Sequence, residues 1–364
     1  MSMKNSRPRV LLIQRVLQKY RIPIYILMQK EVDLTLAYTE KNNINTPQLK
    51  CICLPSIKLG KLCIQRHLYK ILNQYDVVVS QPHFSNFRIC LLPFFPRKFK
   101  FVIWDIGVRA SYKTHFDLSK APSLSNRILN MIQKRADACI FYYRKTIEYW
   151  AKYDNIHIEK YFEAHNTVEV ADFESLPDYE SRDSYLFVGT LYSQKGIEEL
   201  IDAYSIAKQK KGKLPMLKIV GEGPEKNIIQ KQIIKLGLET DIVLCGAIYD
   251  ENILKNLFLK ALLCISPKQA GLTVQKSLGY GTPFVTRPDA YTGGEILDVK
   301  NGENGFLYES VEDLSNLLIY ADQKKQEMFL MSQNAREYYL RKCTPILMAD
   351  GALSAIWYSL ENGG

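Results

Sequence analysis

Residues 185–196 read YLFVGTLYSQKG, and this stretch decides the fold of the second half of the chain. A short apolar run ends in Gly189, the chain turns, and Lys195 stands directly before an amphipathic segment. The pattern is typical of a buried strand, a tight turn and a helix. A glycine backbone, a helix N-terminus and an ammonium group together favour phosphate binding. Lys195 is therefore a candidate phosphate ligand, although an ordinary solvated turn lysine fits the same pattern.

The alternation of strand-like and helix-like segments continues along the rest of the chain. Apolar runs at 216–220, 242–245, 262–265 and 283–286 alternate with amphipathic segments at 197–208, 225–236, 252–261 and 272–280. Such a series of βα units predicts a doubly wound parallel sheet. After residue 308 we expect three helices, at 313–322, 326–341 and 346–360.

The first half of the chain has a similar but less regular pattern. Apolar runs occupy 9–14, 76–80, 99–104 and 138–142, and an amphipathic helix is expected over 123–135. The acidic, proline-containing stretch 168–183 separates the two series. We predict an α/β protein with two Rossmann-like domains, 1–172 and 173–342, which face each other across a cleft. Residues 343–364 are expected to form a C-terminal helix that packs back on the first domain.

Two further strand–helix junctions of the second domain carry candidate residues. IVGEGPE at 219–225 places Glu222 between two glycines and starts a helix after Pro224. ISPKQAGLTVQKSLGYGTP at 265–283 opens a helix at Gly271, and the free amides of a helix N-terminus bind anions. Either junction alone is also explained by turn geometry.

Taken in order, the three junctions resemble the donor domain of the retaining GT-B glycosyltransferases of family four. That family shows FVG-x-L-x-x-x-KG, then VG-x-GP, then a P-x-x-x-G-L segment that ends in G-x-P. Gly293-Gly294-Glu295 and NGENG at 301–305 extend the match. The resemblance covers about residues 185–308, and before that only YRIP at 20–23 and NTV at 166–168 look similar.

The resemblance implies a nucleoside-diphosphate sugar bound between an acceptor-binding first domain and a donor-binding second domain. Lys195 would neutralise the diphosphate, and stabilising that leaving group would be the main catalytic task. No protein nucleophile, cofactor or metal is then expected. The implied donor-binding residues are Gly189, Thr190, Lys195, Gly221, Glu222, Gly223, Pro224, Lys268, Gly271, Leu272, Thr273, Lys276 and Glu295.

Three of these positions depart from the family. Thr190 stands where a diphosphate-binding arginine is usual, and the family's paired glutamates are replaced by Lys268 and Lys276. The second glutamate normally accepts hydrogen bonds from the ribose, whereas an ammonium group only donates. Ribose recognition must therefore differ, or Lys276 binds phosphate in place of the missing arginine, or it is a solvated helix lysine.

The first domain offers fewer candidates. His83 and Asp105 each follow an apolar run, and both are candidates for contact with the acceptor. His83 is also a candidate catalytic residue, together with Lys195. The loop after residue 13 lacks the family's glycines, and Lys19 and Arg21 are candidates there for contact with acceptor or phosphate. Tyr20, in the YRIP match, is a further acceptor-side candidate. An exposed structural histidine and an aspartate that caps a turn are equally simple interpretations.

Charge is distributed unevenly. Residues 1–172 hold 27 lysines and arginines against 13 acidic residues, which gives +14, and 173–364 hold 21 against 25, which gives −4. A basic first domain suits an anionic membrane or a phosphorylated lipid, and no motif indicates nucleic acid. The apolar stretch 89–96 is either a membrane contact or a core helix that ends at proline. The eight scattered cysteines predict buried free thiols and a cytoplasmic protein. The basic first domain adds the inner face of the cell membrane as a candidate location.

The sequence is compatible with two functions and disfavours a third. The first is a retaining, metal-independent glycosyltransferase that extends a glycan, such as a polysaccharide, O-antigen or capsule glycan, on a free or lipid-linked acceptor. The second is a GT-B-shaped protein without catalysis that binds a glycan or a partner enzyme. A dehydrogenase is disfavoured, because G-x-G-x-x-G followed by an acidic residue about 20 positions later is absent.

Overall fold

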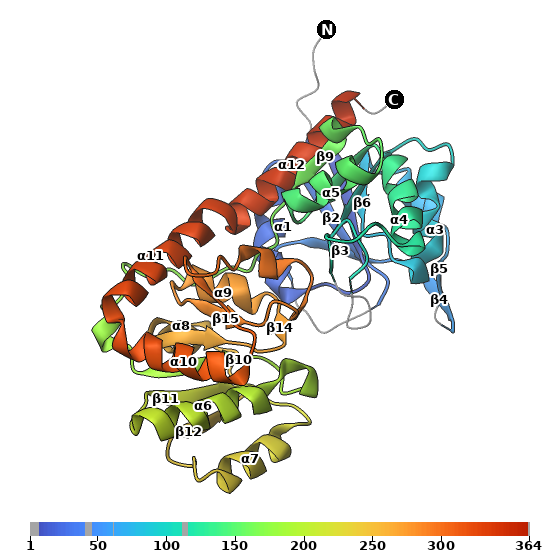
Figure 1. Cartoon of the computed structure of the whole chain (residues 1–364). Coiled ribbons are helices and arrows are strands. Elements are labelled where there is room, and N and C mark those ends of the chain that lie inside the picture. Colours follow the sequence, from blue (N-terminus) through green and yellow to red (C-terminus); the bar gives the residue numbers. More distant parts are fainter. Residues whose placement is uncertain (1–6, 41–45, 61, 111–115, 363–364) are drawn as a thin grey trace. The chain divides into compact units, whose positions relative to one another are not determined.

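The computed structural model describes residues 7–40, 46–60, 62–110 and 116–362 (Figure 1). The chain divides into two compact units, Met1–Asn166 with Pro345–Gly364, and Thr167–Thr344. The sequence places the domain boundary after residue 172, whereas the structure divides after Asn166. Each unit has its own sheet and its own hydrophobic core.

The first unit is built on a seven-stranded parallel sheet with the order β3-β2-β1-β6-β7-β8-β9. Its central strands are apolar throughout because both faces are buried. In β1, Val10 and Leu12 enter the core on one face of the sheet, while Leu11 and Ile13 enter the core on the other. The strands are β1 (Arg9–Gln14), β2 (Asp33–Tyr38), β3 (Lys50–Cys53), β6 (Val77–Ser80), β7 (Lys100–Asp105), β8 (Ala138–Phe141) and β9 (Tyr161–Glu163).

Helices and one antiparallel hairpin complete the first unit. The expected helix at 123–135 is α4, and Ser123 caps it by accepting a hydrogen bond from the Asn126 N–H. The α-helices are α1 (Ile22–Met28), α2 (Leu68–Leu72), α3 (Phe87–Cys90), α4 (Leu124–Lys134), α5 (Arg144–Tyr153) and α12 (Pro345–Asn362). The hairpin is β4 (Ser56–Leu59) with β5 (Leu62–Gln65), and the 3₁₀ turns are η1 (Lys19–Arg21), η2 (Phe84–Asn86), η3 (Leu92–Phe94) and η4 (Ile158–Lys160).

The C-terminal helix α12 belongs to the first unit. Its Met348, Ala352 and Ile356 are buried in the same core as Val10 and Leu12 of β1. A Cβ on Gly351 would lie 2.0 Å from the carbonyl oxygen of Glu163, so the helix approaches the end of β9 at backbone distance.

The second unit contains a six-stranded parallel sheet with the order β12-β11-β10-β13-β15-β17. The strands are β10 (Ser184–Val188), β11 (Met216–Val220), β12 (Ile242–Gly246), β13 (Ala261–Ile265), β15 (Phe284–Thr286) and β17 (Gly305–Leu307), and a two-stranded parallel pair joins β14 (Gln269–Ala270) to β16 (Tyr291–Thr292). The order reverses beside β10, which is where doubly wound sheets bind ligands beyond the carboxyl ends of their strands.

The helices of the second unit lie close to their predicted ranges. They are α6 (Ile197–Lys211), α7 (Lys226–Lys235), α8 (Glu251–Leu259), α9 (Thr273–Gly279), α10 (Val311–Gln323) and α11 (Lys325–Lys342), with the 3₁₀ turns η5 (Tyr179–Ser181), η6 (Ser193–Lys195) and η7 (Glu295–Asp298). Ser310 and Asp313 form a reciprocal capping box at the start of α10.

The structure decides two expectations from the sequence, on the stretch 89–96 and on the cysteines. The stretch 89–96 is mostly core, since Ile89, Cys90 and Leu92 are buried, but it forms the short α3 and η3 rather than one helix. The prediction of buried thiols is wrong for Cys53, which is exposed, although all eight cysteines are free. Among the described residues, none of the helices combines the length and apolar character of a membrane span.

Candidate functional site

Two backbone hydrogen bonds join the carboxyl ends of β10 and β11 and the loops that follow them. The N–H of Gly189 donates to the Val220 carbonyl at 2.9 Å, and the N–H of Leu191 donates to the Glu222 carbonyl at 3.0 Å. The two loops therefore present one continuous surface at the edge of the sheet where the order reverses.

Gly221 and Gly223 are required by the close approach of these loops. A Cβ on Gly221 would lie 1.9 Å from the Gly189 carbonyl oxygen, and one on Gly223 would lie 2.4 Å from the Leu191 carbonyl oxygen. Turn geometry thus accounts for both glycines. Between them, Glu222 pairs with Lys226 at 2.7 Å, and Pro224 occupies the turn that leads into α7.

Lys195 ends the η6 turn and extends back toward Gly189. Its Nζ would lie 3.2 Å from a Cβ built on Gly189, so the ammonium group rests against the glycine backbone. The side chain is largely buried, and burial lowers the pKa of Lys195 to about 8. No carboxylate among the described residues pairs with it. A desolvated cation without a counter-charge is poised to gain from an anionic ligand.

The neighbouring lysine, Lys268, is partly neutralised. Its Nζ lies 3.7 Å from Glu199, a residue of α6 that is held more tightly by Arg287 at 2.6 Å and by the Tyr308 hydroxyl at 2.9 Å. The aliphatic part of Lys268 covers Gly196, where a Cβ would meet it at 2.8 Å.

The start of α9 lies beside the same sheet edge. Gly271 borders open space, since a Cβ there would meet no atom within 4 Å. Leu272 is the N-cap residue, and the Thr273 hydroxyl donates to the Val188 carbonyl at 3.5 Å. Thr190, two residues after Val188, is exposed. The structure thus brings Gly189, Lys195, Gly271 and Thr273 to one edge of the second unit.

Lys276 is not a free cation. Its Nζ contacts Glu251 of α8 at 2.6 Å, and the other oxygen of that carboxylate accepts a hydrogen bond from the Tyr280 hydroxyl at 2.5 Å. Lys276 therefore lacks the unpaired charge that the phosphate-binding interpretation requires. Sequence reasoning missed Glu251, although an acidic residue at the start of a helix directly after a strand was the available signal.

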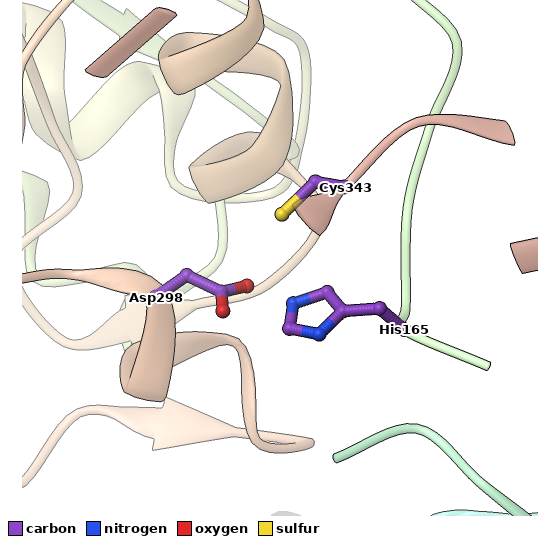
Figure 2. A group of neighbouring side chains, drawn as sticks. All are labelled: His165, Asp298 and Cys343. Atoms are coloured by element: carbon purple, nitrogen blue, oxygen red, sulfur yellow. The ribbon is translucent and has the colours of Figure 1, made fainter. Parts of the chain in front are cut away.

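Glu295 and its neighbours have structural partners. The Glu295 carboxylate is buried and accepts from the Gly293 N–H at 2.7 Å and from the Thr292 hydroxyl at 3.0 Å; burial raises the pKa of this carboxyl group. Asp298, drawn in Figure 2, accepts from Gln275 at 2.6 Å and from Tyr338 at 2.9 Å, so it fastens η7 to α9 and α11.

The second unit by itself offers two potential metal-ligand groups near each other. They are the carboxylate of Asp298 and the thiol of Cys343, both labelled in Figure 2, and their ligand atoms lie within 4.8 Å of each other. Protein zinc sites use three or four protein ligands, so this pair alone is not a metal site.

The first unit contains a cavity at the carboxyl ends of β6 and β7. Its volume is about 270 Å³, and His83, Phe84, Asp105 and Arg109 are among the residues that line it. A second hollow of about 550 Å³ shares His83 and Phe84 and adds Arg15. The guanidinium of Arg109 lies 5.0 Å from the centre of the Phe84 ring. Sequence reasoning placed His83 correctly after its strand, whereas Asp105 is the last residue of β7 rather than the residue after it; both arginines were missed.

Arg109 in this cavity and Arg15 in the second hollow both act on His83, and Glu40 in the second hollow opposes them. The pKa of His83 is lowered, first by partial burial and then by the charges of Arg15 and Arg109. Its Nδ1 lies 2.5 Å from the Ser85 hydroxyl. Neither arginine has a carboxylate partner among the described residues. The cavity therefore favours an anionic group.

Asp105 has two roles in this structure. Its carboxylate accepts a hydrogen bond from the Gly107 N–H at 2.6 Å, so it caps the turn after β7, and it also lines the cavity. Burial raises the pKa of Asp105 to about 7.

Arg21 differs from its prediction as an acceptor contact. The guanidinium is buried and donates to the Asn166 side chain at 2.6 Å and to the Met348 sulfur at 2.7 Å. It also lies 5.1 Å from the ring centres of Tyr20 and Tyr142. Through these contacts Arg21 stabilises the packing of α12 against the N-terminal part of the first unit.

Comparison with known proteins shows what the second unit is similar to. Residues 169–338 match the family model of the glycosyl transferases group 1, so the match lies almost entirely within the second unit. A curated relative, the alpha-monoglucosyldiacylglycerol synthase of Acholeplasma laidlawii, is 23% identical over 178 residues. That match covers 45% of this chain and 42% of the relative, so it spans less than half of the relative's length.

Solved structures extend the likeness to both units. Anabaena HepE in complex with UDP is 16% identical with a TM-score of 0.71, and the match covers 96% of this chain and 99% of that one. A glycosyltransferase from Rickettsia africae is 14% identical with a TM-score of 0.73, over 99% and 100% of the two chains. These likenesses confirm the GT-B fold.

Proposed function

We propose that the protein is a retaining glycosyltransferase that moves a sugar from a nucleoside-diphosphate sugar to a glycan acceptor. The observation that carries the proposal is Lys195, an unpaired and largely buried ammonium group against Gly189 at the edge of a domain that matches the group 1 glycosyl transferases. The leaving diphosphate would satisfy this charge, and the stabilisation would grow as the glycosidic bond breaks.

The test is nucleotide binding by the full chain. A panel of nucleoside diphosphates, with UDP first because a similar solved structure contains it, should raise the melting temperature. Lys195→Ala should abolish this rise, whereas Lys324→Ala, at an exposed lysine of the same unit, should preserve it. If no nucleoside diphosphate stabilises the protein at millimolar concentration, the donor site is refuted.

Retention and independence of metal are the finer parts of the proposal. Product formed from an α-configured nucleotide sugar should be α-linked when its anomeric coupling is measured by NMR. Transfer should continue in excess EDTA, because Lys195 and backbone amides are proposed to stabilise the leaving group without a metal. An inverted product, or complete loss of transfer in EDTA with recovery by a divalent cation, would refute the respective part.

We place the acceptor in the first unit, at the cavity lined by His83, Asp105 and Arg109. The net charge of +14 over residues 1–172 and the unpaired Arg15 and Arg109 support an acceptor that carries phosphate, as lipid-linked glycans do. The name of the curated relative, an alpha-monoglucosyldiacylglycerol synthase, also supports a lipid acceptor. His83 is proposed to contact the reacting hydroxyl group.

A contact with the cytoplasmic face of an anionic membrane would give access to such an acceptor. Leu124 and Met131 of α4 are 76% and 50% exposed, and Leu59 of the β4–β5 hairpin is 66% exposed. Apolar side chains beside the basic Arg127 and Lys58 suit an anionic bilayer surface. The full chain should sediment with phosphatidylglycerol vesicles and not with phosphatidylcholine vesicles, and Leu124→Ser with Met131→Ser should weaken this binding. Equal binding to both vesicles would refute the charge argument.

The alternative of a non-catalytic binding protein is motivated by Lys268 and Lys276, at positions where the family resemblance implies glutamates. Release of UDP from a nucleotide sugar, with or without an added acceptor, distinguishes the two functions. Turnover excludes the alternative, whereas donor binding without release across a wide panel would support it.

A further inference from the structure

Glu251 occupies a favourable place for contact with a nucleotide. It is the first residue of α8, which follows β12, and β12 pairs with β11 in the sheet. The residue therefore lies beyond the carboxyl end of a strand, next to the loop that holds Gly221 and Gly223. In doubly wound nucleotide-binding domains, ligands bind at this edge, and an acidic side chain near it accepts hydrogen bonds from the ribose.

The carboxylate of Glu251 is held in position by two hydrogen bonds and still has free acceptor positions. One oxygen accepts from Lys276 at 2.6 Å and the other from Tyr280 at 2.5 Å, and Asp250 caps α8 through two backbone N–H groups. An ionised carboxylate has about four acceptor positions, so each oxygen retains one. The Glu251 side chain is 40% exposed, which leaves these positions accessible.

Helix α9 connects this carboxylate to the proposed phosphate site. Thr273 and Lys276 are three residues apart and lie on the same face of α9. The Thr273 hydroxyl contacts the Val188 carbonyl, immediately before Gly189, and Lys276 contacts Glu251. Lys276 is thus about one helical turn, roughly 5 Å along α9, beyond the residue that touches the end of β10, and its ammonium group contacts Glu251.

We propose that Glu251 accepts hydrogen bonds from the 2′- and 3′-hydroxyl groups of the bound nucleotide, and that Lys276 and Tyr280 position its carboxylate. The proposal rests on the proposed function, because it adds a residue to the same donor site. Lys276 is then a positioning residue, and it does not bind phosphate.

The test compares UDP with 2′-deoxy-UDP by titration calorimetry on the full chain. Wild-type protein should bind UDP about 10- to 100-fold more tightly, the range for a hydrogen bond to a charged group. In Glu251→Gln the ratio should fall below about 3-fold. Glu337→Gln, which removes a comparable paired carboxylate from the exposed surface of α11, should keep the wild-type ratio.

A second variant separates this role from folding and from phosphate binding. Lys276→Gln retains the Glu251 carboxylate, and circular dichroism spectra of both variants establish that they are folded. If instead Lys276 binds the diphosphate, Lys276→Gln should weaken the binding of UDP and of 2′-deoxy-UDP equally. Glu251→Gln should then keep the wild-type ratio of the two affinities, and this result would overturn the inference. An unchanged ratio in Glu251→Gln also overturns it while leaving the proposed function intact. Failure of UDP to bind the wild-type protein refutes the proposed function instead.

Discussion

Replacing Lys195 with methionine is expected to stabilise the free protein and to abolish nucleotide binding. Burial lowers the pKa of this lysine from 10.5 to about 8, and the described residues supply no counter-charge. At about 1.36 kcal/mol for each pKa unit, the buried charge costs up to about 3 kcal/mol of folding free energy at neutral pH. A methionine of similar length removes this cost and keeps the apolar contacts of the side chain.

The direction of the pH dependence follows from the same pKa shift. Between pH 8 and 10.5 the unfolded chain retains the Lys195 proton while the folded chain loses it, so the wild-type protein regains stability as the pH rises. Below pH 8 both states are protonated and the full cost is present. The advantage of Lys195→Met should therefore be largest at pH 7 and should disappear near pH 11.

Urea unfolding of the full chain, followed by circular dichroism at pH 7 and pH 10, measures this effect. Lys324→Met, at a lysine that is 56% exposed, is the matched control and should change stability little. Titration with UDP measures the loss of binding in parallel. A Lys195→Met protein that is less stable than the wild type at pH 7, or that binds UDP normally, would refute the argument.

Further outcomes follow from the backbone contacts and the first-unit cavity. Gly221→Ala should lower the free energy of unfolding by about 3 kcal/mol, because the Cβ would lie 1.9 Å from the Gly189 carbonyl oxygen and must separate two hydrogen-bonded loops. Gly237→Ala is the control in the same urea assay: its φ is positive but no atom lies within 4 Å of the added Cβ, so it should cost only about 1 kcal/mol. Asp105 has a raised pKa of about 7, so the wild type should lose stability as the pH rises from 4 to 7, and Asp105→Asn should flatten that decline. An unchanged slope would show that the carboxylate is not buried in solution. Arg109→Gln should slow transfer to a polyprenyl-phosphate-linked acceptor about tenfold without changing UDP binding; equal losses of both would indicate a folding defect.

The strands of the second unit were predictable from sequence because both faces of the sheet are buried. Tyr185 and Phe187 enter one core and Leu186 enters the other, so β10 is apolar at successive positions and is recognised as a run. The strand β9 was missed because it is only three residues long, and the strand β2 because Asp33 and Thr35 interrupt its apolar run.

The glycines and Lys195 were identified from sequence because the loop chemistry is local: turn, glycine and helix start are adjacent in the chain. The partners of the other lysines were not predictable in this way. Lys276 pairs with a residue of the preceding helix, and Lys268 pairs with Glu199 on α6, far earlier in the chain. Only the folded sheet brings these carboxylates to the lysines, so spacing could not show that the positive charges were already matched.

The matching of charges indicates how the donor edge can accommodate a diphosphate. Lys276 is 16% exposed and contacts Glu251 at 2.6 Å, so withdrawing it would leave an anchored carboxylate without its cation. Lys268 is 49% exposed and lies 3.7 Å from Glu199, which keeps Arg287 at 2.6 Å and the Tyr308 hydroxyl when Lys268 moves away. Lys268 is therefore the cation that can turn toward a ligand at little cost, because exposed pairs contribute at most about 1 kcal/mol. In the proposed donor site Lys195 would supply a fixed charge and Lys268 an adjustable one, while Lys276 holds Glu251 in place.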